Sequence, residues 1–319
     1  MALGPVSIVV SVYNEAAALP SFWTSLRQEL LVQKAHRFDV VWVNDGSVDA
    51  SAAIISGFVR SATDPHIRHR LLDFSRNFGH EAAMIAGIDH AGGDVVICMD
   101  ADGQHPPTQI PVMLKAVEEG AEVVLMERIQ RADNGFVKNL ASRLFYNTLN
   151  GLSVFRFQEN STDFFLITRP VMDVLRGSFR ERTRFIRGFI QSLGFQRTVL
   201  PFDAPAREHG SSNYSFGKLF KLGVDAVFAF SNKPLRLAVF FSLGFVLLST
   251  FFIGYSLYQF ITSNTVPSGY TTIVIFLSVS FSLLFITLTV FALYFEKMIH
   301  ETRRRPIYIV RRSEGPAPW

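Results

Sequence analysis

The longest charge-free stretch of the sequence is the feature that most constrains the fold. Residues 237–295 contain no aspartate, glutamate, lysine or arginine, and a short polar segment at 262–269 divides them into two apolar blocks. Each block could cross the hydrocarbon core of a membrane, which takes about 20 helical residues. Buried helices of a soluble bundle would normally keep a charged outer face, and neither block has one. We therefore expect two C-terminal transmembrane helices within residues 234–300.

Basic residues flank this pair on one side only. Lys233 and Arg236 precede it, Lys297 and three arginines at 303–305 follow it, and the loop between the blocks is uncharged. By the positive-inside tendency, both chain ends are expected in the cytoplasm of a multi-pass inner (plasma) membrane protein. The start MALGPVSIVV has neither a charged n-region nor a long apolar h-region, so no cleaved signal is expected. Cys98, the single cysteine, fits a reducing compartment.

The first 130 residues have a different pattern, in which short β-branched runs alternate with segments of helical length. The runs are VSIVVSV, FDVVWVN, RHRLLDF, DVVICMD and AEVVLM. Such alternation predicts an α/β fold with a mostly parallel sheet flanked by helices, here within a cytosolic domain at 1–212. The net charge of +4 is modest and partly adjoins the apolar blocks. It therefore indicates an anionic membrane surface as a partner rather than nucleic acid.

After residue 130 the pattern is looser. Residues 136–152 and 214–230 read as amphipathic helices, which either pack on a core or lie at the membrane interface. We expect the second of them to form an interfacial segment at 213–233. A basic cytosolic tail at 301–319 completes the chain, and its end, RRSEGPAPW, is expected to be disordered.

Acidic and amide side chains follow three of the predicted strands, in the stretches YNE (13–15), NDGS (44–47) and DADGQ (100–104). In a parallel sheet, ligands bind beyond the carboxyl ends of the strands. Asp45 could also be explained as a helix cap. Asp100 and Asp102 repel each other unless a cation lies near them, and oxygen ligands favour Mg²⁺ or Mn²⁺. We therefore predict a divalent metal site at Asp100 and Asp102.

Taken together, several motifs resemble family 2 glycosyltransferases of the inverting, nucleotide-sugar-dependent type. These motifs are SIVVSVYNE, VNDGS, FSRNFGHEAAMIAGIDHAGGD and MDADGQHPP. The later stretches ERTRFIRG and REHGSSNYSF, with the two apolar blocks, narrow the resemblance to polyprenyl-phosphate glycosyltransferases such as bacterial GtrB and ArnC and the dolichol-phosphate mannose synthases. The resemblance covers nearly the whole chain and implies a glycosyltransferase A-type fold.

The resemblance also implies roles for individual residues. The nucleotide-sugar donor would be bound by Tyr13, Glu15, Asp45, Asp100, Gln104 and Arg128. The metal and the diphosphate would be organised by Asp100, Asp102 and Gln104. The acceptor phosphate would be bound by Lys138, Ser142, Arg207 and Ser212. Asp163 would act near the reacting centre, either orienting the acceptor or serving as the base. The sequence departs from the family pattern at Thr162, Phe165 and Asn213, which replace a usual glycine, arginine and lysine.

The chemistry of a lipid phosphate acceptor favours cations over a base. Its second pKa is about 6, so much of it is already dianionic at neutral pH. The enzyme must then clamp this anion and neutralise the departing diphosphate. Five arginines within a dozen residues offer such charges, although about half of them are expected to be only solvated. Arg184 is assigned to contact with the acceptor phosphate or a membrane headgroup. The catalytic residues expected are Arg184, Asp102 and Asp163, although a structural acid bound to backbone would also explain Asp163.

The function implied is transfer of one sugar, with UDP-glucose as first choice of donor, to undecaprenyl or another polyprenyl phosphate with inversion. One alternative is a mannose synthase that uses GDP-mannose, and another is a non-catalytic membrane scaffold that binds nucleotide. Packing between spans would allow a homo-oligomer. Among the histidines, His66 and His69 are interpreted as surface residues. His80 and His105 could line the pocket, although a helix-entry or packing role is expected for them.

Overall fold

A computed structural model describes residues 4–129, 161–180, 186–205, 233–262, 269–303 and 305–317. These residues belong to two compact units, one that holds the sheet together with residues 305–317, and one that holds two long apolar helices. The amphipathic helices predicted at 136–152 and 214–230 lie outside the described residues.

The sheet of the first unit has, among the described residues, the strand order β7-β5-β6-β4-β1-β2-β3-β8. Neighbours β1–β2, β1–β4, β2–β3 and β5–β7 are parallel, whereas β6 and β8 run antiparallel to the strands beside them. The predicted mostly parallel sheet is therefore confirmed. The strand bounds are β1 Val6–Val12, β2 Phe38–Asn44, β3 Ile67–Phe74, β4 Val95–Asp100, β5 Val123–Arg128, β6 Ser161–Thr168, β7 Arg197–Phe202 and β8 Val310–Glu314.

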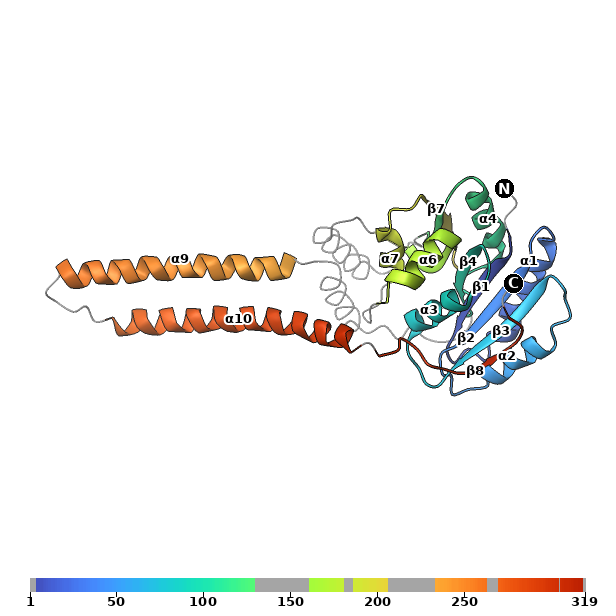
Figure 1. Cartoon of the computed structure of the whole chain (residues 1–319), viewed down its shortest axis with the longest axis horizontal. Helices are drawn as coiled ribbons and strands as arrows, with labels where there is room; N and C mark the ends of the chain where they lie inside the picture. The colour runs from blue at the N-terminus through green and yellow to red at the C-terminus, as the bar shows by residue number, and fades with distance from the viewer. Residues whose placement is uncertain are drawn as a thin grey trace. The chain divides into compact units, whose positions relative to one another are not determined.

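Helices cover both faces of this sheet (Figure 1). One face packs against α1, α2 and α4, whose apolar side chains share a single core with alternate strand residues. The other face carries α3, α6 and α7. The helix bounds are α1 Leu19–Val32, α2 Ser51–Arg60, α3 His80–His90, α4 Ile110–Glu118, α6 Arg169–Ser178 and α7 Ile186–Ser192.

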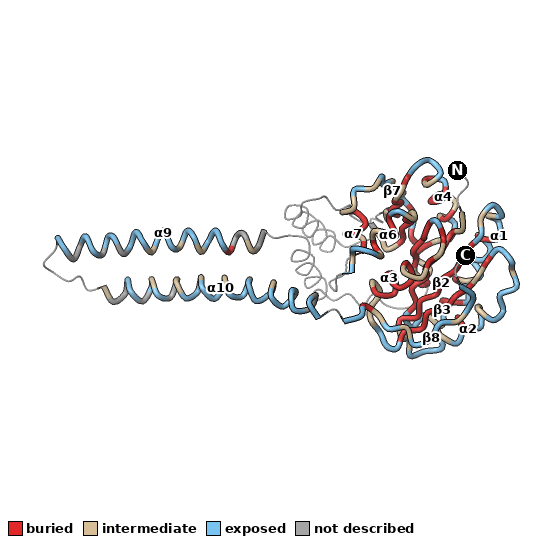
Figure 2. The backbone as a smooth tube through the Cα atoms, in the orientation of Figure 1, coloured by how far each residue is buried: buried red, intermediate tan, exposed pale blue. Residues whose placement is uncertain are grey.

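The central strands are buried along their whole length, as Figure 2 shows. All seven residues of β1 and of β2 are buried, because helices lie on both faces. A parallel strand in that position needs a continuous apolar run, and this is why the first two runs in the sequence match the strands residue for residue. Packing is close on the α3 face, since a Cβ at Gly87 would overlap the Val9 side chain.

The end of the chain was predicted wrongly. Residues expected to be disordered form β8, which pairs antiparallel with β3 and closes that edge of the sheet. Just before it, the ring of Tyr308 stacks on Phe74 with centroids 5.4 Å apart, and Ile307 is buried. The tail after the apolar helices is therefore part of the sheet unit.

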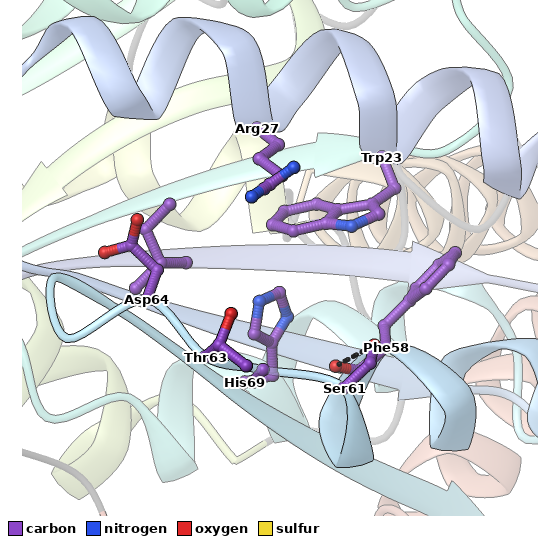
Figure 3. A pocket seen from close by; sticks show the side chains of 9 residues that line it. Trp23, Arg27, Phe58, Ser61, Thr63, Asp64 and His69 are labelled. Atoms are coloured by element: carbon purple, nitrogen blue, oxygen red, sulfur yellow. Dashed lines mark hydrogen bonds between the residues drawn. The ribbon is translucent and has the colours of Figure 1, made fainter.

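His69 is a second correction, because the structure buries a histidine that was interpreted as a surface residue. Its Nδ1 accepts a hydrogen bond from Trp42 Nε1 at 3.1 Å, and its side chain is 4% exposed. Burial, helped by the positive charge of Arg27, lowers the pKa of His69 from 6.5 to about 4. A cavity of about 180 Å³ beside it is lined by Trp23, Arg27 and Phe58 among others (Figure 3). His66, by contrast, is exposed as expected.

This pKa predicts a loss of stability in mild acid. Below pH 6.5 the unfolded chain takes up a proton at residue 69 that the folded chain binds only near pH 4. The free energy of unfolding should therefore fall as the pH falls through this window, by on the order of 3 kcal/mol in total. Melting temperatures of the purified chain between pH 7 and 4 should drop less steeply for His69→Gln than for the wild type. His66→Gln is the matched control, and equal slopes in all three proteins would contradict the prediction.

The second unit is a pair of antiparallel helices, α9 Lys233–Thr262 and α10 Tyr270–Thr302. Ser242 Oγ lies 3.4 Å from Thr287 Oγ1, and the Phe245 and Phe276 rings stack with centroids 5.8 Å apart. Many large apolar side chains point outward. Among the described residues, one segment, Ile275–Glu296, is long and apolar enough to cross a membrane, whereas the apolar stretch of α9 is shorter.

Candidate active site

Several strand ends meet at one edge of the sheet. Strands β4, β1 and β2 are parallel neighbours, so the loops that follow Asp100, Val12 and Asn44 lie at the same edge. Because β6 runs antiparallel to β4, its first residues reach this edge too. The structure therefore brings together the DADGQ, YNE and NDGS stretches, as predicted, and adds Asp163 to them.

Hydrogen bonds join the loops after β1 and β2. The Asn14 N–H donates to Ser47 Oγ at 2.9 Å, and the Val48 N–H donates to Asn14 Oδ1 at 2.9 Å. Asn14 has a positive φ of 56°, a conformation that asparagine tolerates better than most residues. Gly46 has a φ of 65°, and a Cβ there would overlap the backbone of Arg76. These hydrogen bonds hold the loop after β1, which carries Tyr13 and Glu15, against the loop after β2.

Asp45 is buried at this surface and binds backbone. Its Oδ1 accepts from the Phe78 N–H at 2.7 Å and its Oδ2 accepts from the Gly79 N–H at 2.9 Å. The carboxylate thus positions the turn that leads into α3, whose first residue is His80. Asp45 therefore connects the loop after β2 to the start of α3.

The loop after β4 places its two acids differently. Asp100 accepts a 2.6 Å hydrogen bond from Ser11 Oγ, and its side chain is 26% exposed. Asp102 is buried, and its Oδ1 accepts from the Gln104 N–H at 3.0 Å, which fixes the turn through Gly103. His105 stacks on Phe164 with centroids 5.0 Å apart, which confirms its packing role.

The protonation of His105 follows from its hydrogen bond. Its Nδ1 accepts from the Asp100 N–H at 2.9 Å, so this nitrogen carries no proton. The approach of Asp100 Oδ2 to the same atom, at 3.8 Å, is therefore a contact and not an ion pair.

His80 has a larger role than helix entry or packing, the roles that the sequence analysis favoured. Its Nδ1 lies 3.1 Å from Ser11 Oγ, which itself donates to Asp100, and its Nε2 lies 3.3 Å from Asp163 Oδ2. Both ring nitrogens therefore donate, which requires the protonated ring. Burial favours the neutral form, but Asp100 and Asp163 outweigh it and raise the pKa of His80 to about 10.

Asp163 lies between two cations. Its Oδ1 is 2.9 Å from Arg187 Nε, and its Oδ2 faces His80. Burial alone would raise the pKa of this carboxyl, but Arg187 and His80 more than compensate and lower it well below its usual range. A carboxylate held in this way is a weak base at neutral pH, so the geometry favours an orienting role for Asp163.

Glu81 anchors the helix that carries Arg187. Its Oε2 accepts from the Ile186 N–H at 2.9 Å, at the start of α7. Burial and the nearby Asp163 charge raise the pKa of Glu81, against the opposing effects of that N–H, Arg187 and His80. Residues of α3, β6 and α7 therefore form one connected charged cluster beside Asp100.

The other predicted site residues, with two arginines of the cluster at 176–187, divide into three groups. Arg128 is exposed at the end of β5, two strands away from β4 at the same edge. Arg176 donates to the carbonyls of Ile88 and Ala91, and Arg180 pairs with Asp89 at 2.8 Å, so both support α3. Five predicted residues lie outside the described residues: Lys138, Ser142, Arg184, Arg207 and Ser212.

Two of the three departures from the family pattern have local explanations, and the third, Asn213, lies outside the described residues. Thr162 Oγ1 donates to the Met126 carbonyl at 2.9 Å, which ties β6 to β5. Phe165 is fully buried in β6, so at this position the chain has a core residue in place of a cation.

The acidic pair fits a divalent cation of the Mg²⁺ type. Within the described residues no group of three acidic, histidine or cysteine side chains is arranged to hold a metal. Mg²⁺ usually takes one or two carboxylates from the protein and completes its shell with water and substrate phosphates. Asp100 and Asp102 supply such oxygens at the edge where a diphosphate would arrive.

Sequence reasoning had one usable signal for the missed residues. His80 and Arg187 both fall inside motifs that were recognised, FSRNFGHEAAM and RFIRG, but each is distant in sequence from Asp163. Their contact depends on how α3 and α7 pack beside β6, which a residue pattern does not give. Ser11 reads simply as a small residue within an apolar strand.

Comparisons with known proteins identify the family of the chain. The family model described as glycosyl transferase family 2 matches residues 7–176, more than half of the chain. The chain is 33% identical over 316 residues to the uncharacterized glycosyltransferase YkcC of Bacillus subtilis strain 168, covering 97% of this chain and 94% of that one. It is 31% identical to the SfII prophage-derived bactoprenol glucosyl transferase of Shigella flexneri, covering 98% and 99%.

A solved structure is also similar, the glucosyl-3-phosphoglycerate synthase of Mycobacterium tuberculosis, with a TM-score of 0.45 and 18% identity over 70% of this chain and 78% of that one. The family match and the relatives that align over nearly their full length confirm the resemblance seen in the motifs. The chain belongs to glycosyl transferase family 2.

Proposed function

We propose that the protein transfers a single glucose from UDP-glucose to a polyprenyl phosphate, with inversion at the sugar carbon. The observation that carries this proposal is the match to bactoprenol glucosyl transferases over nearly the full length of both chains. The acidic strand-end site supports it. The nucleoside diphosphate that leaves the sugar needs positive charge nearby, and a cation held by these acids would supply it.

The donor is assigned to the surface made by the loops after β1, β2 and β4. Tyr13, Glu15 and Asp45 would contact the base and ribose, and Arg128 would approach from the end of β5. Asp100, Asp102 and Gln104 would hold Mg²⁺ or Mn²⁺ with the diphosphate. When bound, the ion would supply positive charge that stabilises the leaving group.

The acceptor needs orientation more than deprotonation, because its phosphate is already ionised. The Asp163 cluster supports this division of work. Asp163 holds Arg187 and His80 at 2.9 and 3.3 Å, so two cations lie beside the acids that would carry the donor. We assign Asp163 as an orienting residue, and we assign acceptor phosphate contact to Lys138, Ser142, Arg184, Arg207 and Ser212.

A polyprenyl chain stays in the bilayer, so the enzyme must work at a membrane surface. The chain connectivity supports two crossings. The described residues up to 205 and residues 305–317 belong to one compact unit, and α9 and α10 lie between them in sequence. If α10 crosses the membrane, the chain must cross back to rejoin that unit, and α9 is the apolar segment available. The flanking Lys and Arg residues support a cytoplasmic location for the sheet unit.

The test is sugar transfer by the purified chain in the presence of Mn²⁺ and a short polyprenyl phosphate. Labelled UDP-glucose should give lipid-linked label, and unlabelled UDP should compete more strongly than GDP. Label from GDP-mannose with preferred competition by GDP would favour the mannose synthase instead. Absence of lipid-linked label from every donor, while the nucleotide still raises the melting temperature, would favour the scaffold.

A further inference from the structure

Arg311, in the tail that follows α10, forms an ion pair with the buried Asp73 near the end of β3. Arg311 Nη2 lies 2.7 Å from Asp73 Oδ2. The Asp73 side chain is 1% exposed, whereas the Arg311 side chain is 64% exposed. A buried carboxylate is destabilised by the loss of its cation far more than an exposed guanidinium is by the loss of its anion. The main effect of this ion pair is therefore to stabilise the Asp73 carboxylate.

An irregularity in strand pairing explains how Arg311 reaches this position. Along β8, Val310 pairs with Phe74 and Arg312 pairs with Asp73, so one step on β3 corresponds to two steps on β8. Arg311 is the extra residue. A bulge of this kind redirects a side chain away from the regular alternation of the strand, and it turns the Arg311 guanidinium toward Asp73.

The other oxygen of Asp73 leads to the donor surface. Asn44 Nδ2 donates to Asp73 Oδ1 at 2.7 Å, and Asn44 Oδ1 accepts from the Ser47 N–H at 3.4 Å. Ser47 Oγ in turn accepts from the Asn14 N–H. A continuous series of hydrogen bonds therefore runs from the tail, through Asp73 and Asn44, to both loops that are assigned to the nucleotide.

We propose that Arg311 is a positioning residue for donor binding, acting through Asp73 and Asn44 on the loops at 13–16 and 44–48. The role rests on the proposed function, because those loops are assigned to the nucleotide of a sugar donor. The tail beyond the apolar helices thereby contributes to the donor half of the site. It does so without contacting the substrate.

The tail is fixed well enough to perform this role. Tyr308 OH donates to Asp89 Oδ2 at 2.8 Å, and Arg180 binds the same carboxylate through two nitrogens. The Ser75 N–H donates to the Ile309 carbonyl at 3.0 Å. On the other side of the bulge, Arg70 Nε donates to the Pro316 carbonyl at 3.2 Å, so contacts before and after the bulge hold Arg311 against Asp73.

Arg311→Gln tests the proposal, with Arg312→Gln as its matched control. Arg312 is the next residue of β8, but its guanidinium contacts Ser56 at 3.2 Å and Glu314 at 3.1 Å rather than Asp73. Arg311→Gln should weaken binding of UDP-glucose with Mn²⁺ by about five- to tenfold, measured by calorimetry. In transfer assays the donor KM should rise by a similar factor, with kcat and the acceptor KM changed by less than about twofold.

Two further arms separate positioning from a general loss of structure. The double variant Asp73→Asn with Arg311→Gln should regain part of the donor affinity, because it removes the buried charge that the single variant leaves without its cation. Hydrogen exchange should be faster in peptides covering 13–16 and 44–48 in Arg311→Gln and unchanged there in Arg312→Gln.

The outcomes are distinct. Unchanged exchange and unchanged donor KM in Arg311→Gln would overturn the positioning role, as would equal effects in Arg312→Gln. If the wild type binds none of the nucleotide sugars tested, the proposed function fails. The exchange comparison needs no ligand and would still decide whether Arg311 positions these loops.

Discussion

Replacing Asp102 by asparagine is expected to reduce sugar transfer by at least about 10²-fold, which corresponds to roughly 3 kcal/mol in the barrier. The loss follows from removing one of the two strand-end carboxylates assigned to the cation and diphosphate. Folding should be preserved, because an asparagine Oδ1 can still accept the 3.0 Å hydrogen bond from the Gln104 N–H. Turnover at saturating donor and Mn²⁺, with the melting temperature of each variant, is the measurement.

Asp94→Asn provides the control for this substitution. Asp94 precedes β4 at the opposite edge of the sheet, is 55% exposed, and pairs with Arg169 at 3.6 Å. It should keep turnover close to the wild type. Near-normal transfer by Asp102→Asn would refute the assignment of the cation to this loop.

The second large effect is expected for Asp163→Asn. The change keeps the shape of the side chain but removes the charge that holds Arg187 and His80, so kcat should fall by about 10²-fold. Breaking a largely buried ion pair should also lower the free energy of unfolding by on the order of 3 kcal/mol. The donor affinity should change little, because Asp45, Asp100 and Asp102 keep their partners.

Calorimetric binding of the donor separates these two effects from simple unfolding. A variant that binds UDP-glucose normally but fails to transfer sugar has lost the acceptor or the reaction step. Asp173→Asn is the matched control, since Asp173 is 60% exposed on α6 and pairs with Arg176 at 3.7 Å. An orienting role for Asp163 is contradicted if Asp163→Asn transfers sugar at the wild-type rate.

The parts of the fold that could be predicted from the sequence are the strands buried in the core. Strands β1 and β2 need continuous apolar runs because helices cover both of their faces, and the sequence shows those runs directly. β8 has no such run, since an edge strand can carry arginines on exposed positions and a glutamate on a half-buried one. Its residues therefore read as a charged, disordered tail.

The site was predictable to the extent that it lies at strand ends. Asp100 and Asp102 are conspicuous in sequence because they interrupt an apolar run. His80 and Arg187 were not assigned, because their roles arise from contacts with Asp163 at 83 and 24 residues' separation. His69 was misjudged for a related reason: a histidine among charged neighbours looks exposed, although its strand position turns it inward toward Trp42.

The position of β8 in the chain has a consequence for biosynthesis. The outer edge of β3 stays open until the ribosome has made every residue of α9 and α10, because its partner strand comes after them. An open strand edge invites association with other chains, so a nascent protein that stalls within those helices would be prone to aggregate. The sheet can therefore be completed only after α10 has been made, so assembly of the sheet unit is linked to the order of synthesis.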